Sequence, residues 1–145
     1  MSNPPLTPLE QSQRRIRLML VDDMPQVLHD LRQLLELTGL VEIVATATSG
    51  LEAVRLAGER SPEAILLDLE MPGMDGYEAT RRIKSQTPGV RVIILSVHAG
   101  PESIECARTA GADAFVQKGA SLDTLMNAIV EKGNLLKSSD PKRGA

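Results

Sequence analysis

The sequence predicts a doubly wound α/β domain, in which a five-stranded parallel sheet carries five helices on its two faces. Short apolar runs rich in branched residues alternate five times with longer segments whose apolar residues recur at helical spacing. Parallel strands need crossover connections, and these are right-handed, so the pattern favours helices on both faces of one sheet. The 145 residues suffice for one domain that buries a core without disulfides.

The first strand and helix are predicted over residues 16–23 and 24–39. The strand segment, "IRLMLVDD", is a short apolar run that stops at two acids, as a buried strand does. In the helix, Pro25 suits the first turn and Gly39 suits the end. The apolar residues at helical spacing are Val27, Leu28, Leu31, Leu34 and Leu35.

Four further units repeat this order. The strands are predicted over 41–47, 63–68, 90–96 and 113–118, and the helices over 50–60, 76–86, 101–111 and 121–133. The domain is expected to span 16–134, between an N-terminal tail (1–15) and a C-terminal tail (135–145). Leu135 and Leu136 could instead extend the last helix or dock on a neighbouring element.

Composition and charge exclude several classes of function. The formal net charge of -3 offers no basic surface, so direct nucleic-acid binding is not expected. The N-terminus has no apolar run typical of a signal peptide, and no stretch is long enough to span a membrane. We therefore expect a cytoplasmic protein without a membrane partner. The only cysteine, Cys106, is predicted to be a partly buried, unreactive helix residue.

Polar side chains follow four of the five predicted strands. Ligands of an open α/β sheet bind outside the carboxyl ends of the strands, so these residues are candidates for a site. Three of them are carboxylates, which repel one another unless a cation lies among them. Oxygen ligands without His or Cys favour Mg²⁺ over zinc. The strand-end residues are Asp22, Asp23, Asp68, Ser96 and Lys118.

Such a site suits a phosphoryl group. A metal ion and the Lys118 ammonium can stabilise phosphoryl oxygens, the Ser96 hydroxyl can donate to them, and a carboxylate can be the nucleophile that forms an acyl phosphate. Each residue alone has an ordinary explanation; Asp23, for example, could cap the following helix. Their convergence on one edge of the sheet favours the phosphoryl site.

Residues 17–133 resemble the receiver domain of bacterial two-component response regulators, which has a flavodoxin-like fold. The motifs are "VDD", "LLDLEMPGMDG", "ILS" and "FVQKG". The resemblance implies that Asp68 accepts a phosphoryl group from a sensor histidine kinase or a phosphotransfer protein, and that Lys118 pairs with the phosphoryl oxygens. It also implies a signalling switch that catalyses only its own Mg²⁺-dependent phosphorylation and dephosphorylation, rather than an enzyme.

The resemblance further implies how a divalent ion, Mg²⁺ or Mn²⁺, is held. Asp23 would ligate it directly and Asp22 largely through water. Asp68 and the backbone carbonyl of Glu70 would complete the site. These ligands follow from the family's motif and not from the spacing of the residues.

Four residues match positions that have switching or rate-tuning roles in the family. Ser96 would be the switch hydroxyl that moves toward the phosphoryl group, and Phe115 the switch aromatic, although Phe115 could equally fill the core. His98 and Glu70 would flank the entrance and tune the rates of phosphorylation and dephosphorylation. His98 is otherwise an ordinary loop histidine.

Other details indicate the subgroup and the output. Gly119 follows Lys118 where the family usually has proline, which puts the cis peptide bond often found there in doubt. "KGAS" and "LSVHAGPE" resemble LuxR/NarL-type receivers, which precede a DNA-binding domain, so we expect a stand-alone receiver or part of a transcription factor. A homodimer would use the helix at 101–111, the last strand and the last helix, including Ile104, Phe115 and residues from Ser121 onward.

Three alternative functions have some support in the sequence. A magnesium-dependent aspartyl phosphatase of the haloacid dehalogenase class needs Asp-x-Asp and a cap domain, whereas Glu70 holds the second position here. An EF-hand loop lacks ligands at Pro72 and Ala79. A degenerate receiver that only binds proteins stays open, although the intact set of acids and Lys118 argues against it.

Overall fold

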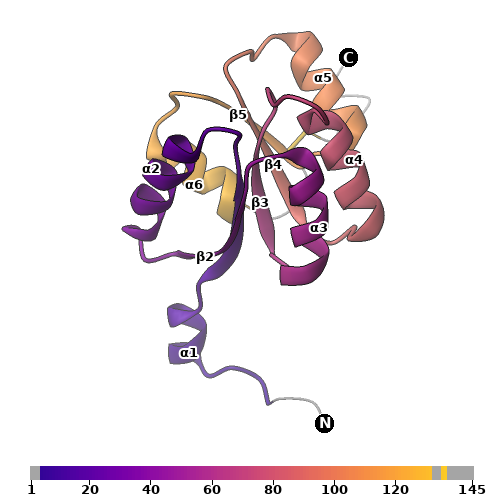
Figure 1. The fold of residues 1–145 in the computed structure, drawn as a ribbon. Coiled ribbons are helices and arrows are strands. Elements are labelled where there is room, and N and C mark those ends of the chain that lie inside the picture. Colours follow the sequence, from indigo (N-terminus) through magenta and orange to yellow (C-terminus); the bar gives the residue numbers. More distant parts are fainter. Residues whose placement is uncertain (1–3, 132–134, 137–145) are drawn as a thin grey trace, which may run out of the picture.

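The computed structural model describes residues 4–131 and 135–136 (Figure 1). Its strands are β1 (Ile16–Val21), β2 (Val41–Ala47), β3 (Ala64–Asp68), β4 (Arg91–Ser96) and β5 (Ala114–Gln117). They form one sheet in the order β2-β1-β3-β4-β5, and every neighbouring pair is parallel. The predicted five-stranded parallel sheet is therefore confirmed.

Six helices lie within the described residues: α1 (Pro8–Gln13), α2 (Pro25–Glu36), α3 (Gly50–Arg60), α4 (Gly76–Gln86), α5 (Pro101–Ala110) and α6 (Leu122–Val130). The last five are the predicted helices. The first lies in the segment expected as a tail, and Figure 1 shows it apart from the sheet. Thr7 and Glu10 form a capping box at its start, since each backbone N–H donates to the other's side chain, at 2.8 and 3.2 Å.

The helices form two layers, with α2 and α6 on one face of the sheet and α3, α4 and α5 on the other (Figure 1). Alternate residues of each strand enter the two layers because successive side chains point to opposite faces. In β1, Leu18 and Leu20 pack toward α2 and α6, and Met19 and Val21 toward the other three helices. Both faces of the sheet are thus buried, as a doubly wound fold requires.

The strand order places the site. The chain passes from β1 to β2 on one side and then to β3 on the other, so the order reverses between β1 and β3, where ligands of such sheets bind. Val21 pairs with Leu67 in this register. Asp22 and Asp68, the residues that follow, consequently emerge side by side at the carboxyl edge.

Cys106 and the bond after Lys118 are two single-residue features that the sequence raised. Cys106 is exposed, so the expectation of partial burial was wrong: the residues of α5 that face the core are Ala107 and Ala110. The Lys118–Gly119 peptide bond is trans, and Gly119 has a φ of +93°, a conformation that suits glycine.

For the C-terminal segment, the sequence allows either a tail or docking on a neighbouring element. Leu136 packs against the core cluster beneath α3, α4 and α5, and the Leu135 N–H donates to the Asp113 carbonyl at 2.7 Å. Residues 1–3, residues 132–134, which include the predicted end of the last helix at 133, and the rest of the predicted tail, 137–145, lie outside the described residues. None of the described helices has both the length and the apolar character needed to cross a membrane.

Candidate functional site

Asp22 and Asp23 follow β1 at the carboxyl edge of the sheet. Asp22 is buried, and its Oδ1 accepts a hydrogen bond from the Met24 N–H at 2.9 Å. Its Oδ2 is buried without a hydrogen-bond partner and lies 3.6 Å from the Lys118 Nζ. Met24 is the N-cap residue of α2, and no side chain caps that helix end. Asp23 therefore does not serve as the cap that its position suggested.

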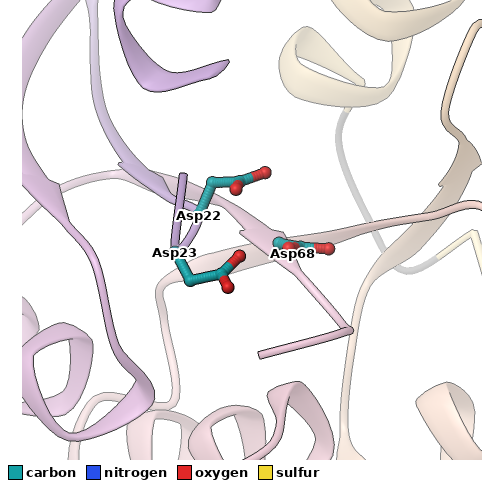
Figure 2. Close-up of side chains that lie close together, drawn as sticks. All are labelled: Asp22, Asp23 and Asp68. Atoms are coloured by element: carbon teal, nitrogen blue, oxygen red, sulfur yellow. The ribbon is translucent and has the colours of Figure 1, made fainter. Parts of the chain in front are cut away.

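Asp68 is the last residue of β3 and is 2% exposed. Its Oδ1 accepts hydrogen bonds from the Lys118 Nζ at 3.0 Å and from the Glu70 N–H at 3.2 Å. One carboxylate oxygen from each of Asp22, Asp23 and Asp68 lies within 4.8 Å of the others. Figure 2 shows the three side chains close together at this edge of the sheet. The structure thus brings the three predicted carboxylates together with the predicted lysine.

The protonation of these groups follows from burial and charge. Burial raises the pKa of Asp68 above its ordinary value, and the charge of Asp22 adds to this, while the hydrogen bond from Lys118 opposes it. For Lys118, burial alone would lower the pKa, but the hydrogen bond to Asp68 and the charges of Asp68, Asp22 and Glu70 outweigh it and raise the pKa. Lys118 is therefore held as an ammonium ion among acids.

This arrangement fits a hard divalent cation. The three carboxylates face one ammonium, so the cluster keeps an excess of negative charge. The orphaned Oδ2 of Asp22 is a buried acceptor that a metal ion or its water could satisfy. Oxygen ligands alone favour Mg²⁺ or Mn²⁺.

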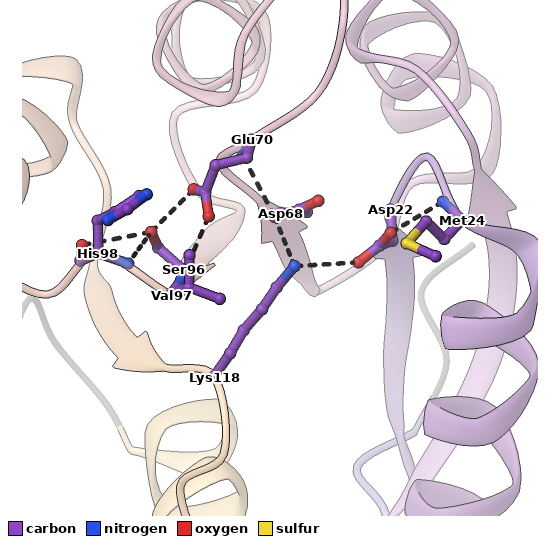
Figure 3. Close-up of polar contacts among 8 residues, drawn as sticks. All are labelled: Asp22, Met24, Asp68, Glu70, Ser96, Val97, His98 and Lys118. Atoms are coloured by element: carbon purple, nitrogen blue, oxygen red, sulfur yellow. Dashed lines mark hydrogen bonds and ion pairs between the residues drawn. The ribbon is translucent and has the colours of Figure 1, made fainter.

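Ser96 is fully buried at the end of β4 but does not donate to Asp68. Its Oγ donates to the Glu70 Oε2 at 2.8 Å and accepts from the His98 N–H at 3.0 Å. The Val97 N–H donates to the other Glu70 oxygen at 3.2 Å (Figure 3). This contact of Glu70 is not predictable from the sequence, because a side-chain hydrogen bond between two loops leaves no local pattern.

The remaining two predicted residues, His98 and Phe115, differ in their surroundings. His98 is exposed and contacts Ser96 through its backbone. Phe115 is partly buried and packs against the core cluster of α3, α4 and α5, so it is at least a packing residue in this state.

The loop after β3 is positioned by a close backbone approach. A Cβ on Gly76 would lie 2.8 Å from the Leu69 Cα and 2.9 Å from the Asp68 carbonyl oxygen, so only glycine lets α4 begin here. Asp75 caps that helix by accepting from the Glu78 N–H at 2.9 Å. The close approach at Gly76 and the cap at Asp75 together hold the loop after β3 close to the end of that strand, where Asp68 lies.

Comparison with known families identifies the domain. Residues 18–130 match the response regulator receiver domain model. The chain belongs to this family. Receiver domains of this family take phosphoryl groups from histidine kinases in two-component systems and bind Mg²⁺ at an acidic pocket. This receiver has a cluster of three aspartates at the carboxyl edge of its sheet.

Similar proteins place the receiver among regulators of the NarL and LuxR kind. The nitrate/nitrite response regulator protein homolog of Haemophilus influenzae is 32% identical over 132 residues, which cover 90% of this chain and 64% of that protein. The transcriptional regulatory protein LiaR of Bacillus subtilis is 36% identical over 114 residues, which cover 79% and 54%. This chain thus spans less than two thirds of the length of either relative.

Solved structures agree with the fold of this receiver. A LuxR-family two-component response regulator from Aurantimonas sp. SI85-9A1 superposes with a TM-score of 0.75 at 36% identity, over 79% of this chain and 81% of that one. A LuxR-family DNA-binding response regulator from Staphylococcus aureus gives a TM-score of 0.72 at 33% identity, over 78% and 94%.

Proposed function

We propose that Asp68 is the phosphoacceptor of this receiver and that Asp22, Asp23 and Asp68 hold the Mg²⁺ or Mn²⁺ ion. The observation that supports this most is the convergence of three carboxylate oxygens within 4.8 Å of one another around a strand-end aspartate that also pairs with Lys118. The backbone carbonyl of Glu70 is the fourth proposed ligand. When bound, the ion would neutralise the acids and the oxygens of the incoming phosphoryl group.

The proposed reaction is transfer from a phosphohistidine of the kinase or phosphotransfer partner. A carboxylate oxygen of Asp68 attacks phosphorus, the phosphorus–nitrogen bond breaks with its electron pair going to the imidazole, and the imidazole takes up a proton from water. An acyl phosphate remains on Asp68. Lys118 and the Glu70 N–H both donate to Oδ1, so we assign the attack to Oδ2.

The surrounding side chains have separate tasks. Lys118 keeps Asp68 ionised for attack, because its hydrogen bond opposes the effect of burial on the pKa of that carboxyl. After transfer the same ammonium neutralises a phosphoryl oxygen. Attack of water on the phosphorus of the acyl phosphate returns the free carboxylate and inorganic phosphate, and Glu70 and His98 at the entrance tune that rate.

The proposed output is a conformational change that controls a partner. Ser96 moves to donate to a phosphoryl oxygen, Phe115 follows, and the surface of α5, β5 and α6, with Ile104 and residues from Ser121 onward, changes its affinity for a second copy or for a target. Light scattering with and without beryllofluoride tests the homodimer: a doubled mass supports it, and an unchanged monomer mass contradicts it.

The site itself is tested by nuclear magnetic resonance with Mg²⁺ and beryllofluoride, an analogue of the phosphoryl group. In the wild type we expect the amide signals of residues 68–70, 96–98 and 118 to shift on adding both reagents. Asp68→Asn removes the proposed acceptor and should abolish the beryllofluoride response. An equal response in that variant would contradict the proposal.

A further inference from the structure

We infer that Glu70 is a built-in competitor of the phosphoryl group: its carboxylate occupies the Ser96 hydroxyl and the Val97 N–H, and phosphorylation of Asp68 must displace it. The inference rests on the proposed function, since it concerns the same site. It adds a residue that acts through Ser96 to set how readily the receiver switches.

The Glu70 carboxylate is held by two donors, as a bound anion would be. The two oxygens of Glu70 take one donor each, Ser96 Oγ at 2.8 Å and the Val97 backbone nitrogen at 3.2 Å (Figure 3). The single hydroxyl proton of Ser96 has a second possible acceptor, the His98 carbonyl at 3.3 Å, but the shorter contact is with Glu70. A hydroxyl and a backbone N–H that converge on two anionic oxygens can receive phosphoryl oxygens equally well.

The position of Glu70 links this contact to the acceptor. Its own N–H donates to the Asp68 Oδ1, while its side chain reaches the residues that follow β4. β3 and β4 are neighbours, and Asp68 pairs with Leu95, the residue before Ser96. The carboxylate therefore spans the short gap between the proposed acceptor and the proposed switch hydroxyl.

Phosphorylation and this contact exclude each other for two reasons. A phosphoryl group on Asp68 would compete for the Ser96 proton, which can be donated to only one acceptor at a time. It would also place new negative charge beside the Glu70 carboxylate, and like charges at close range repel. Ser96 thus has two alternative partners, which makes the loop a two-state element biased by Glu70 toward the unphosphorylated state.

Two variants separate the hydrogen bonds from simple charge. Glu70→Gln removes the charge at nearly constant shape, and Glu70→Asp keeps the charge but is one methylene shorter and loses its reach to Ser96. With saturating Mg²⁺ we expect both variants to bind beryllofluoride about tenfold more tightly than the wild type, about 1.4 kcal/mol. Glu102→Gln, an exposed acid in the first turn of α5, is the control for net charge and should leave affinity unchanged.

The gain must depend on the switch hydroxyl. In a Ser96→Ala background the effect of either Glu70 variant should shrink, because the principal donor that Glu70 occupies is gone. If only Glu70→Gln binds more tightly and Glu70→Asp behaves as the wild type, repulsion alone accounts for the effect and the inference is overturned.

A measurement without ligand completes the test. Hydrogen exchange of the Val97 amide should be faster in Glu70→Asp than in the wild type, because the variant loses the acceptor of that N–H. Unchanged exchange overturns the inference. If the wild type binds beryllofluoride and the variants bind it equally, the inference alone fails. If the wild type does not bind it at all, the proposed function fails as well.

Discussion

Lys118 is the ammonium that two buried carboxylates share, at 3.0 Å from the Asp68 Oδ1 and 3.6 Å from the Asp22 Oδ2. Lys118→Met leaves both acids uncompensated in the metal-free protein, so we expect the free energy of unfolding to fall by about 2 kcal/mol, less than for a fully buried pair because the lysine is partly exposed. Urea unfolding in EDTA measures this.

Added Mg²⁺ should recover part of the loss in Lys118→Met, because a bound cation compensates the same acids. The control is Arg55→Met, which removes an exposed cation paired with Glu59 on α3 and should change stability by less than about 0.5 kcal/mol. A loss of equal size in both variants would show that the lysine has no special place in the site.

Asp68 gives a prediction for pH. Burial raises its pKa in the folded, metal-free protein above the ordinary 3.8, so the folded state keeps this proton at pH values where the unfolded state has lost it. The free energy of unfolding therefore falls as the pH rises through the pKa that Asp68 has in the folded state. At neutral pH the ionised carboxylate destabilises the fold. Asp68→Asn, which mimics the protonated form, should be the more stable protein there.

The stability margin of Asp68→Asn over the wild type should narrow as the pH falls through the folded pKa toward 3.8. Urea unfolding in EDTA at a series of pH values checks this. If the difference in stability between Asp68→Asn and the wild type stays constant, or grows as the pH falls, burial does not raise the pKa of this carboxyl.

At the scale of elements, the start of α4 holds the acceptor strand in place through Gly76. Gly76→Ala puts a Cβ within 2.8 Å of the Leu69 Cα, so we expect a loss of about 1–3 kcal/mol from overpacking, together with weaker Mg²⁺ binding. The matched control is Gly58→Ala in α3, whose Cβ meets nothing within 4 Å and which should stabilise by about 1 kcal/mol. Thermal unfolding and Mg²⁺ titration of both variants provide the measurement.

The elements also show what a sequence can predict. β2, α3 and α4 match their predicted bounds, because the two helices begin at the side-chain caps Ser49 and Asp75, which are local signals. The short α1 was missed, since a single capping box between Thr7 and Glu10 is weak evidence within a proline-rich segment. The predicted partial burial of Cys106 was wrong, because neighbouring residues of a helix point in different directions and the next residue, Ala107, is the one that faces the core.

The candidate site was predictable where it depends on topology alone. In a parallel sheet the strand ends meet at one edge, so Asp22, Asp23, Asp68 and Lys118 could be placed together from sequence. The contact of Glu70 with Ser96 and Val97 could not, since it depends on a side-chain conformation across two loops.

At the scale of the whole molecule, the fold is a rigid support that gathers four strand ends and leaves the loops after β3 and β4 to respond. Core residues of β1, β3 and β4 are almost fully buried, whereas Glu70, Val97 and His98 are exposed. We therefore propose that a chemical change at Asp68 reaches the surface of α5, β5 and α6 through these loops while the sheet stays in register.

Intact mass after incubation with acetyl phosphate and Mg²⁺ is the most direct test of whether this receiver accepts a phosphoryl group on Asp68. The wild type should gain the mass of one phosphoryl group, EDTA should prevent the gain, and Asp68→Asn should show none. A wild type that gains no mass with Mg²⁺, or an Asp68→Asn variant that gains as much as the wild type, would contradict the account.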